Sequence, residues 1–227
     1  SLEVSDSKTV IIFWEIINII EGLQYKINNL DEKELENLCL TIEENIDFLL
    51  DNLKEVPLLL FNEFSCFSFT FNNYINNRLE NICSRLNAHL LSKKQTNLQI
   101  ISIDKIISQN GVLNSIDFRK YYSSKVLYKP DFLKRYSDYV NPMISSSVGK
   151  SKKCIIFDCD NTLWNGILGE DGPEKIQMSH NDKIGKFFHE IQNIAINLNK
   201  KGIIIGLCSK NNLSDVDDIF KNHKDLS

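Results

Sequence analysis

The sequence lacks the features that mark several large classes of protein. No uninterrupted apolar run approaches the ~20 residues that a membrane-spanning helix needs, and no signal-peptide pattern stands at the start. Basic residues form no block or stripe and the formal net charge is −4, which argues against a nucleic-acid-binding surface. The six cysteines are scattered and form neither a CxxC metal site nor a disulfide framework. We therefore expect a protein of the reducing cytoplasm that binds neither membrane nor nucleic acid.

What is present is the composition of an ordinary globular protein. The hydrophobic content is 42%, the charged content is 25%, and 227 residues fit one large domain or two small ones. The best candidate for a linker is the segment 145–153, in which small and polar residues at 145–149 are followed by a basic stretch at 150–153. We therefore predict one unit over residues 1–147 and a second over residues 148–227.

The first predicted unit alternates strand and helix patterns. Strands are expected at residues 9–14, 56–61 and 98–103, and helices at residues 31–54, 72–91, 104–109 and 130–147. Asp31 is a plausible N-cap with Glu34 at the N3 position, and Pro130 suits a helix start. Three strand–helix repeats predict a three-layer α/β (Rossmann-like) unit with a mainly parallel sheet.

The second predicted unit opens with an apolar run that stops at an acidic cluster. Four apolar residues at 154–157, bounded by charge, predict a parallel strand buried on both faces. Asp158 and Asp160 then lie at the carboxyl end of this strand, where open parallel sheets place their ligands. Two carboxylates this close repel unless a cation or a shared proton intervenes, so the sequence implies an oxygen-seeking cation, most simply Mg²⁺. A calcium-like turn or an Asx-rich loop is the alternative interpretation.

A second buried strand is predicted at residues 203–208, after an amphipathic helix at residues 181–201. Ser209 follows that strand as Asp158 follows its own, so the two strand ends are expected side by side. The next helix, at residues 211–221, has free N–H groups at its start, which favour an anion. Ser209 as a simple helix cap remains an alternative.

Residues 158–172, DCDNTLWNGILGEDG, and the later SKNN at 209–212 resemble the FkbH-like branch, subclass IIIC, of the haloacid-dehalogenase (HAD) superfamily. The first motif of that superfamily is DxDxT after a hydrophobic strand. The resemblance implies a truncated HAD fold for the second unit, with the superfamily's third and fourth motifs beyond Ser227, and hence a fragment of a longer protein. The first unit loosely resembles the SGNH-hydrolase-like domain that precedes the HAD domain in this family, and we expect its first strand to be missing.

The resemblance also implies roles for individual residues. Asp158 would attack phosphorus as the nucleophile, and Asp160 would act as the general acid/base. The side chain of Asp158 and the main-chain carbonyl of Asp160 would hold Mg²⁺. The residues expected to bind the substrate phosphate are Thr162, Ser209, Lys210 and Asn211. For Lys210 an ordinary solvated charge remains an alternative.

Cys159 lies between the two aspartates and is a candidate to hold an acyl group as a thioester, although a buried cysteine can be a simple small hydrophobe. The leading hypothesis is a Mg²⁺-dependent HAD-type phosphatase and glyceryl (acyl) transferase of polyketide-type biosynthesis. It would act on a phosphorylated small-molecule acyl donor, such as 1,3-bisphosphoglycerate, with an acyl carrier protein as acceptor. The alternatives are a plain small-metabolite phosphatase and a non-catalytic carrier-docking module.

Overall fold

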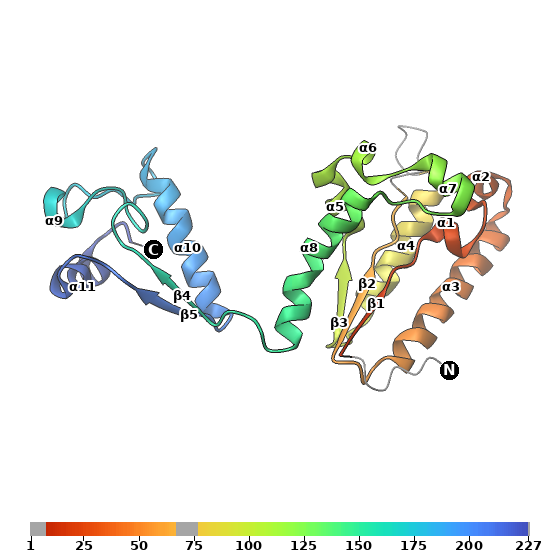
Figure 1. Cartoon of the computed structure of the whole chain (residues 1–227), viewed down its shortest axis with the longest axis horizontal. Coiled ribbons are helices and arrows are strands. Elements are labelled where there is room, and N and C mark those ends of the chain that lie inside the picture. Colours follow the sequence, from red (N-terminus) through yellow and green to blue (C-terminus); the bar gives the residue numbers. More distant parts are fainter. Residues whose placement is uncertain (1–7, 67–76, 227) are drawn as a thin grey trace. The chain divides into compact units, whose positions relative to one another are not determined.

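Two parallel sheets, one in each half of the chain, organise the structure, a computed structural model that describes residues 8–66 and 77–226 (Figure 1). The chain divides into two compact units, Ser1–Lys150 and Ser151–Ser227. All the paired strands in both sheets run parallel, which confirms the predicted α/β class. No helix in the described part of the chain is both long enough and apolar enough to cross a membrane.

The first sheet has the strand order β1-β2-β3. Its strands are β1 (Thr9–Ile12), β2 (Leu58–Asn62) and β3 (Leu98–Ile101). All three strands lie where they were predicted, but their ends differ by one or two residues, and two of these differences have a local cause. Pro57 has no N–H to donate to a ladder, so β2 begins after it. β1 ends early because the N–H of Trp14 donates to Asn62 Oδ1, at 2.7 Å, in place of a strand partner.

Helices flank this sheet, with α3 and α8 on opposite sides of it in Figure 1. The longer helices are α3 (Glu32–Asn52), α4 (Arg78–Ser92), α5 (Ile103–Asn110) and α8 (Pro130–Ser147). The shorter ones are α1 (Ile16–Ile19), α2 (Leu23–Lys26), the 3₁₀ helix η1 (Ile27–Asn29), α6 (Val112–Ser115) and α7 (Phe118–Ser124).

The predicted start of α3 is confirmed. The main-chain N–H of Glu34 donates to Asp31 Oδ1, and the N–H of Asp31 donates to Glu34 Oε2, both at 2.8 Å, which is a complete capping box. Pro130 begins α8 as predicted. The helix predicted over residues 72–91 is α4, which begins at Arg78 with Asn77 as its cap, and the predicted residues 72–76 lie outside the described residues.

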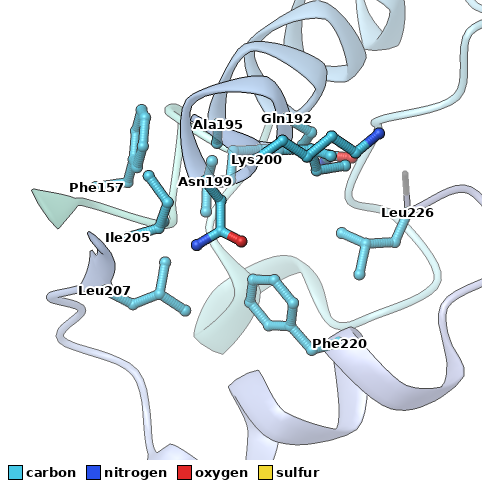
Figure 2. Close-up of a pocket in the computed structure, with 11 residues that line it drawn as sticks. Phe157, Gln192, Ala195, Asn199, Lys200, Ile205, Leu207, Phe220 and Leu226 are labelled. Atoms are coloured by element: carbon cyan, nitrogen blue, oxygen red, sulfur yellow. The ribbon is translucent and has the colours of Figure 1, made fainter. Parts of the chain in front are cut away.

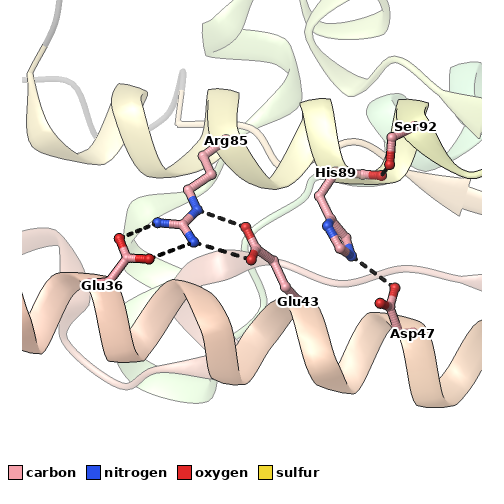
Figure 3. Close-up of polar contacts among 6 residues, drawn as sticks. All are labelled: Glu36, Glu43, Asp47, Arg85, His89 and Ser92. Carbon is pink, nitrogen blue, oxygen red and sulfur yellow. Dashed lines mark hydrogen bonds and ion pairs between the residues drawn. The ribbon is translucent and has the colours of Figure 1, made fainter.

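Ion pairs join α3 and α4 along their outer edge (Figure 3). The guanidinium of Arg85 contacts the carboxylates of Glu36 and Glu43, and His89 Nε2 lies 2.8 Å from Asp47 Oδ1. Pairs of this exposure contribute at most about 1 kcal/mol each. The apolar side chains beneath them, which include the fully buried Ile46, Leu86 and Leu90, therefore provide most of the stability of this contact.

The second unit is built on β4 (Cys154–Phe157) and β5 (Ile204–Leu207), with α9 (Leu168–Asp171), α10 (Gly185–Lys200) and α11 (Leu213–Asn222). The two strands pair in parallel with Phe157 opposite Leu207. The core of this unit includes the fully buried Trp164 and Met178.

The prediction that both strands of the second unit are buried on both faces is wrong. Ile156 and Ile204 are 64% and 63% exposed, and Cys154 and Cys208, expected in buried strands, are exposed as well. The helix α10 packs against the alternate residues of these strands, such as Ile205. Because side chains alternate across a strand, Ile156 and Ile204 point to the other face of the sheet, where they stay largely exposed.

Adjacent leucines at the end of α4 test its orientation. Leu90 is fully buried, whereas Leu91 is 71% exposed. Leu90→Ala removes apolar contacts and leaves a cavity, so we expect the free energy of unfolding to fall by about 2–5 kcal/mol. Leu91→Ala is expected to change it by about 0.5 kcal/mol or less. Urea unfolding followed by circular dichroism measures both, and similar losses in the two variants would contradict this orientation.

Candidate functional site

The loops after β4 and β5 leave the second sheet at the same edge. The N–H of Cys208 donates to the carbonyl of Phe157 at 2.9 Å, so the ladder continues to the last residue of β4. The acidic loop that starts at Asp158 therefore lies beside the loop that starts at Ser209. Parallel pairing thus brings two segments that are distant in sequence to one place.

Asn211 fastens these two loops together. Its side-chain Nδ2 donates to Asp160 Oδ2 at 2.9 Å and to Ser209 Oγ at 3.1 Å. Its main-chain N–H also donates to Ser209 Oγ, at 3.2 Å. The Asp160 contact spans 51 positions of the chain, so this one amide side chain sets how the two loops face each other.

The carboxylate of Asp160 is held by neutral donors from its own loop as well. Its Oδ1 accepts hydrogen bonds from the indole Nε1 of Trp164, at 3.0 Å, and from the main-chain N–H of Leu168, at 3.1 Å. Trp164 is fully buried, so the indole donor has little freedom to move. Among the described donors, Oδ2 accepts a hydrogen bond from Asn211 alone, which leaves a lone pair for the proton that the predicted general acid/base role requires, and that role stays a prediction.

Asp158 is more open than Asp160. Its side chain is exposed, and its Oδ1 accepts a hydrogen bond from the N–H of Cys159 at 2.8 Å. Within residues 8–66 and 77–226, no hydrogen-bond donor contacts its Oδ2. One carboxylate oxygen of this exposed residue is therefore held by a hydrogen bond and the other has no described donor, so the second oxygen can act as a nucleophile or a metal ligand.

Cys159 is buried between these two aspartates. Burial raises the pKa of its thiol; a hydrogen bond with Ser209 acts in the opposite direction, and the carboxylates of Asp158 and Asp160 raise the pKa further. Reactive cysteines are usually partly exposed and have a lowered pKa. The thioester role of Cys159 therefore stays a prediction that neither its exposure nor its pKa favours.

The remaining predicted residues lie on the same two loops. Lys210 is exposed, and Thr162 is half-buried with its main-chain N–H bound to the carbonyl of Cys159 at 3.2 Å. Asn161, which the sequence analysis did not single out, has a φ of 54° and accepts the N–H of Gly166 through its side-chain Oδ1 at 3.0 Å. Asn tolerates this left-handed conformation better than most residues. An asparagine in the predicted turn after the strand was therefore the sequence feature that could have indicated the role of Asn161.

An apolar cavity of about 320 Å³ lies directly behind the strand ends (Figure 2). The last residues of the two strands, Phe157 and Leu207, line it together with Phe220 of α11 and residues of α10. On one side Gln192 Nε2 donates to the carbonyl of Leu163 at 2.7 Å, which ties α10 to the acidic loop. None of the predicted site residues lines this cavity, so the polar site lies at the strand ends outside it.

No family model matches this chain, and no curated protein matches it either. Among solved structures, the chain is similar to the N-terminal part of the protein BF1531 from Bacteroides fragilis, a crystal structure that contains a phosphatase domain complexed with Mg. The two share 26% sequence identity with a TM-score of 0.75 over 96% of this chain. The chain spans 58% of the length of that structure. This likeness agrees with the parallel α/β fold described above.

Two adjacent asparagines give a matched test of the contact between the loops. Asn211 donates to a carboxylate of the other loop, whereas the side chain of Asn212 donates a hydrogen bond to Asp215 of its own helix. We expect Asn211→Ala to lower the free energy of unfolding by about 1.5–3 kcal/mol, because it removes the hydrogen bond to Asp160 Oδ2 from a carboxylate that then keeps only its donors on Oδ1 among the described residues. Asn212→Ala is expected to lower it by about 0.5 kcal/mol or less. Thermal unfolding compares them, and an equal effect of both would contradict the role of Asn211.

Proposed function

We propose that this chain carries the first catalytic loops of a Mg²⁺-dependent phosphatase of the HAD superfamily. The observation that carries this proposal is the meeting of the Asp158–Asp160 loop with the Ser209–Asn211 loop at one edge of a parallel sheet. Ligands of open α/β sheets bind at such edges. The similarity to a structure with a phosphatase domain complexed with Mg supports the same activity.

The residues at this edge fit Mg²⁺. The free oxygen of Asp158 and the main-chain carbonyl of Asp160 would be its protein ligands. No group of three His, Cys, Asp or Glu side chains in the described ranges is placed to hold a metal. Mg²⁺ does not require one, because it usually binds one or two carboxylates and completes its octahedron with water and phosphate oxygens. When bound, the ion would offset the negative charge of a phosphoryl group.

The side chains can be assigned steps in phosphate transfer. Asp158 would attack phosphorus through Oδ2, forming an aspartyl-phosphate as the bond from phosphorus to the leaving oxygen breaks. Asp160 would protonate that leaving oxygen and later take a proton from the water that hydrolyses the intermediate.

The second loop would bind the phosphoryl oxygens. Ser209 Oγ accepts two hydrogen bonds from Asn211, so its own hydrogen is left to donate to the Cys159 thiol that it contacts or to a phosphoryl oxygen. The exposed ammonium group of Lys210 and the hydroxyl group of Thr162 are further donors that we assign to the phosphate.

A finer proposal concerns the acyl group. The donor would be an acyl phosphate such as 1,3-bisphosphoglycerate, and the thiolate of Cys159 would attack its carbonyl carbon and release phosphate. The thiol of an acyl carrier protein would then take the acyl group by thioester exchange, with the first unit as a docking surface for the carrier. The support for this step is the resemblance of residues 158–172 to the FkbH-like branch and the position of Cys159 next to Asp158.

Phosphatase activity is tested with Asp158→Asn in the full-length protein. The substitution keeps the shape of the side chain but removes the nucleophile, so we expect Mg²⁺-dependent phosphate release to fall by at least about 10³-fold. Asp217→Asn, which changes an exposed residue paired with Lys221 on α11, is the control and should retain activity. Chelation of Mg²⁺ with EDTA should abolish release by the unmodified protein. Unchanged release by Asp158→Asn would refute the proposed nucleophile.

Acyl transfer is tested separately by intact mass of a carrier protein incubated with the full-length protein, Mg²⁺ and 1,3-bisphosphoglycerate. We expect the carrier to gain the mass of a glyceryl group. Cys159→Ser should prevent this gain and the phosphate release that accompanies it, while hydrolysis at Asp158 continues to release phosphate. Phosphate release without any change in carrier mass would favour the plain phosphatase. No release of phosphate by the full-length protein would favour a non-catalytic docking module.

A further inference from the structure

A second cavity, of about 310 Å³, lies in the first unit at the carboxyl end of β1. Its walls come from the residues that follow β1, from the segment between α7 and α8, and from α8 itself. The polar and aromatic residues that line it are Phe13, Glu15, Asn18, Lys125, Tyr128 and Tyr136. All of them belong to one compact unit, and none belongs to the phosphatase site proposed above.

Glu15 is a buried acid in this cavity that lacks a cationic partner. Its side chain lies in a residue that is only 6% exposed, and the hydroxyl of Tyr128 donates to its Oε1. Burial raises the pKa of Glu15 to about 8; the hydrogen bond from Tyr128 opposes this effect, and the nearby carboxylate of Asp104 adds to it. In the described part of the chain, no Lys, Arg or His forms an ion pair with Glu15.

The surroundings of Glu15 are acidic. Asp104 and Glu63 also lie at the carboxyl edge of this sheet. The hydroxyl of Ser65 donates to Asp104, and the hydroxyl of Ser102 and the main-chain N–H of Asp104 donate to Glu63, so all three donors are neutral. Neither carboxylate forms an ion pair with any described residue. Among the described residues that line the cavity, the one basic side chain is Lys125, which is already paired with Glu21 at 2.9 Å. The electrostatic potential at Glu15 therefore favours a positive charge that the protein itself does not supply.

The aromatic walls favour an organic cation. Phe13 lies with its ring centre 5.4 Å from that of Tyr128 and 5.2 Å from that of Tyr136, so three rings meet at the cavity. Aromatic faces attract ammonium groups. Tyr136 is only 8% exposed, and among the described residues its phenol oxygen has no hydrogen-bond partner. Burial raises the pKa of Tyr136 to about 12, so the phenol stays neutral and its oxygen can accept a hydrogen bond.

We propose that this cavity binds the ammonium group of a small primary amine. An alkylammonium has three N–H donors, and the cavity offers three acceptors in the Glu15 carboxylate, the Tyr136 oxygen and the Asn18 amide oxygen. The volume lies at the small end of the range for ligand sites, which suits an amine of a few carbon atoms. The cavity is less suited to a metal ion, because its walls are aromatic and the described residues include no group of three His, Cys, Asp or Glu side chains that could hold one.

Binding is expected to depend on pH through Glu15. The carboxyl group is mostly protonated below a pKa of about 8, so it must release a proton to pair with the cation. Tyr128 and Asp104 act on Glu15, the thiol of Cys83 interacts with it electrostatically, and the ammonium group of Lys125 lines the same cavity. The pKa values of Tyr128 and Cys83 are raised, so both stay neutral up to pH 8, and burial raises the pKa of Asp104 as well. A simple alkylamine stays protonated over the same range, because its pKa is about 10.5. The affinity should therefore rise with pH until Glu15 is ionised.

Isothermal titration of the full chain with n-propylammonium chloride tests the proposal. We expect binding that strengthens about fiftyfold between pH 6 and pH 8, no detectable binding of propionate, and at least fivefold weaker binding of tetramethylammonium, which has no N–H donors. Glu15→Gln keeps an acceptor for Tyr128 but cannot ionise, so it should lose at least tenfold in affinity and lose the pH dependence. Tyr136→Phe should weaken binding roughly fivefold.

The matched control is Tyr139→Phe, which removes the phenol of a more exposed tyrosine that does not line the cavity, and it should bind as the unmodified chain does. Asp158→Asn should also leave amine binding unchanged, so failure of this proposal and failure of the phosphatase proposal are distinguishable. Absent binding at pH 8, equal or tighter binding of propionate, or unchanged binding by Glu15→Gln overturns the proposal. If Glu15→Gln fails to fold, the proposal is tested by the pH dependence of amine binding to the unmodified chain and by the affinity of Tyr136→Phe for the amine.

Discussion

Parallel strand pairing is the constraint on which both polar centres of this protein depend. Parallel neighbours end at the same edge of a sheet, so polar residues that directly follow each strand are forced together however far apart they lie in the chain. In the second unit this joins Asp160 to Asn211. In the first unit it joins Trp14, which follows β1, to Asn62, which is the last residue of the neighbouring strand β2. The main chain of Trp14 and the side chain of Asn62 exchange two hydrogen bonds. The helices that cover the sheets then determine how far the residues at each edge are shielded from solvent.

The two centres treat their carboxylates differently. Asp160 receives hydrogen bonds from an indole, a main-chain and an amide donor. Glu15 receives one phenol donor in a buried place, and that is too little to offset its desolvation, so its pKa is raised to about 8. Asp160 therefore accepts hydrogen bonds from three donors and Glu15 from one, and Glu15 is also the more deeply buried of the two.

Local patterns predicted local structure well in this chain. The capping box at Asp31 and Glu34, the strand runs and the start of α8 at Pro130 depend on contacts between near neighbours, which periodicity and capping rules describe. The exposure of Ile156 was not predictable in this way, because an apolar run looks the same whether a helix covers one face of the sheet or both. The indole bond from Trp164 to Asp160 was missed for a similar reason, since it depends on how the loop folds back after Asn161.

The positions of the two tryptophans have a practical consequence. The sequence contains two tryptophans, and the division of the chain places Trp14 in the first unit and Trp164 in the second. Each lies beside the polar centre of its own unit, Trp14 through its main chain to Asn62 and Trp164 through its indole to Asp160. Intrinsic fluorescence is therefore a built-in reporter of both halves. A variant that retains a single indole would show the emission of one half alone, so that events at either centre can be followed without any added label.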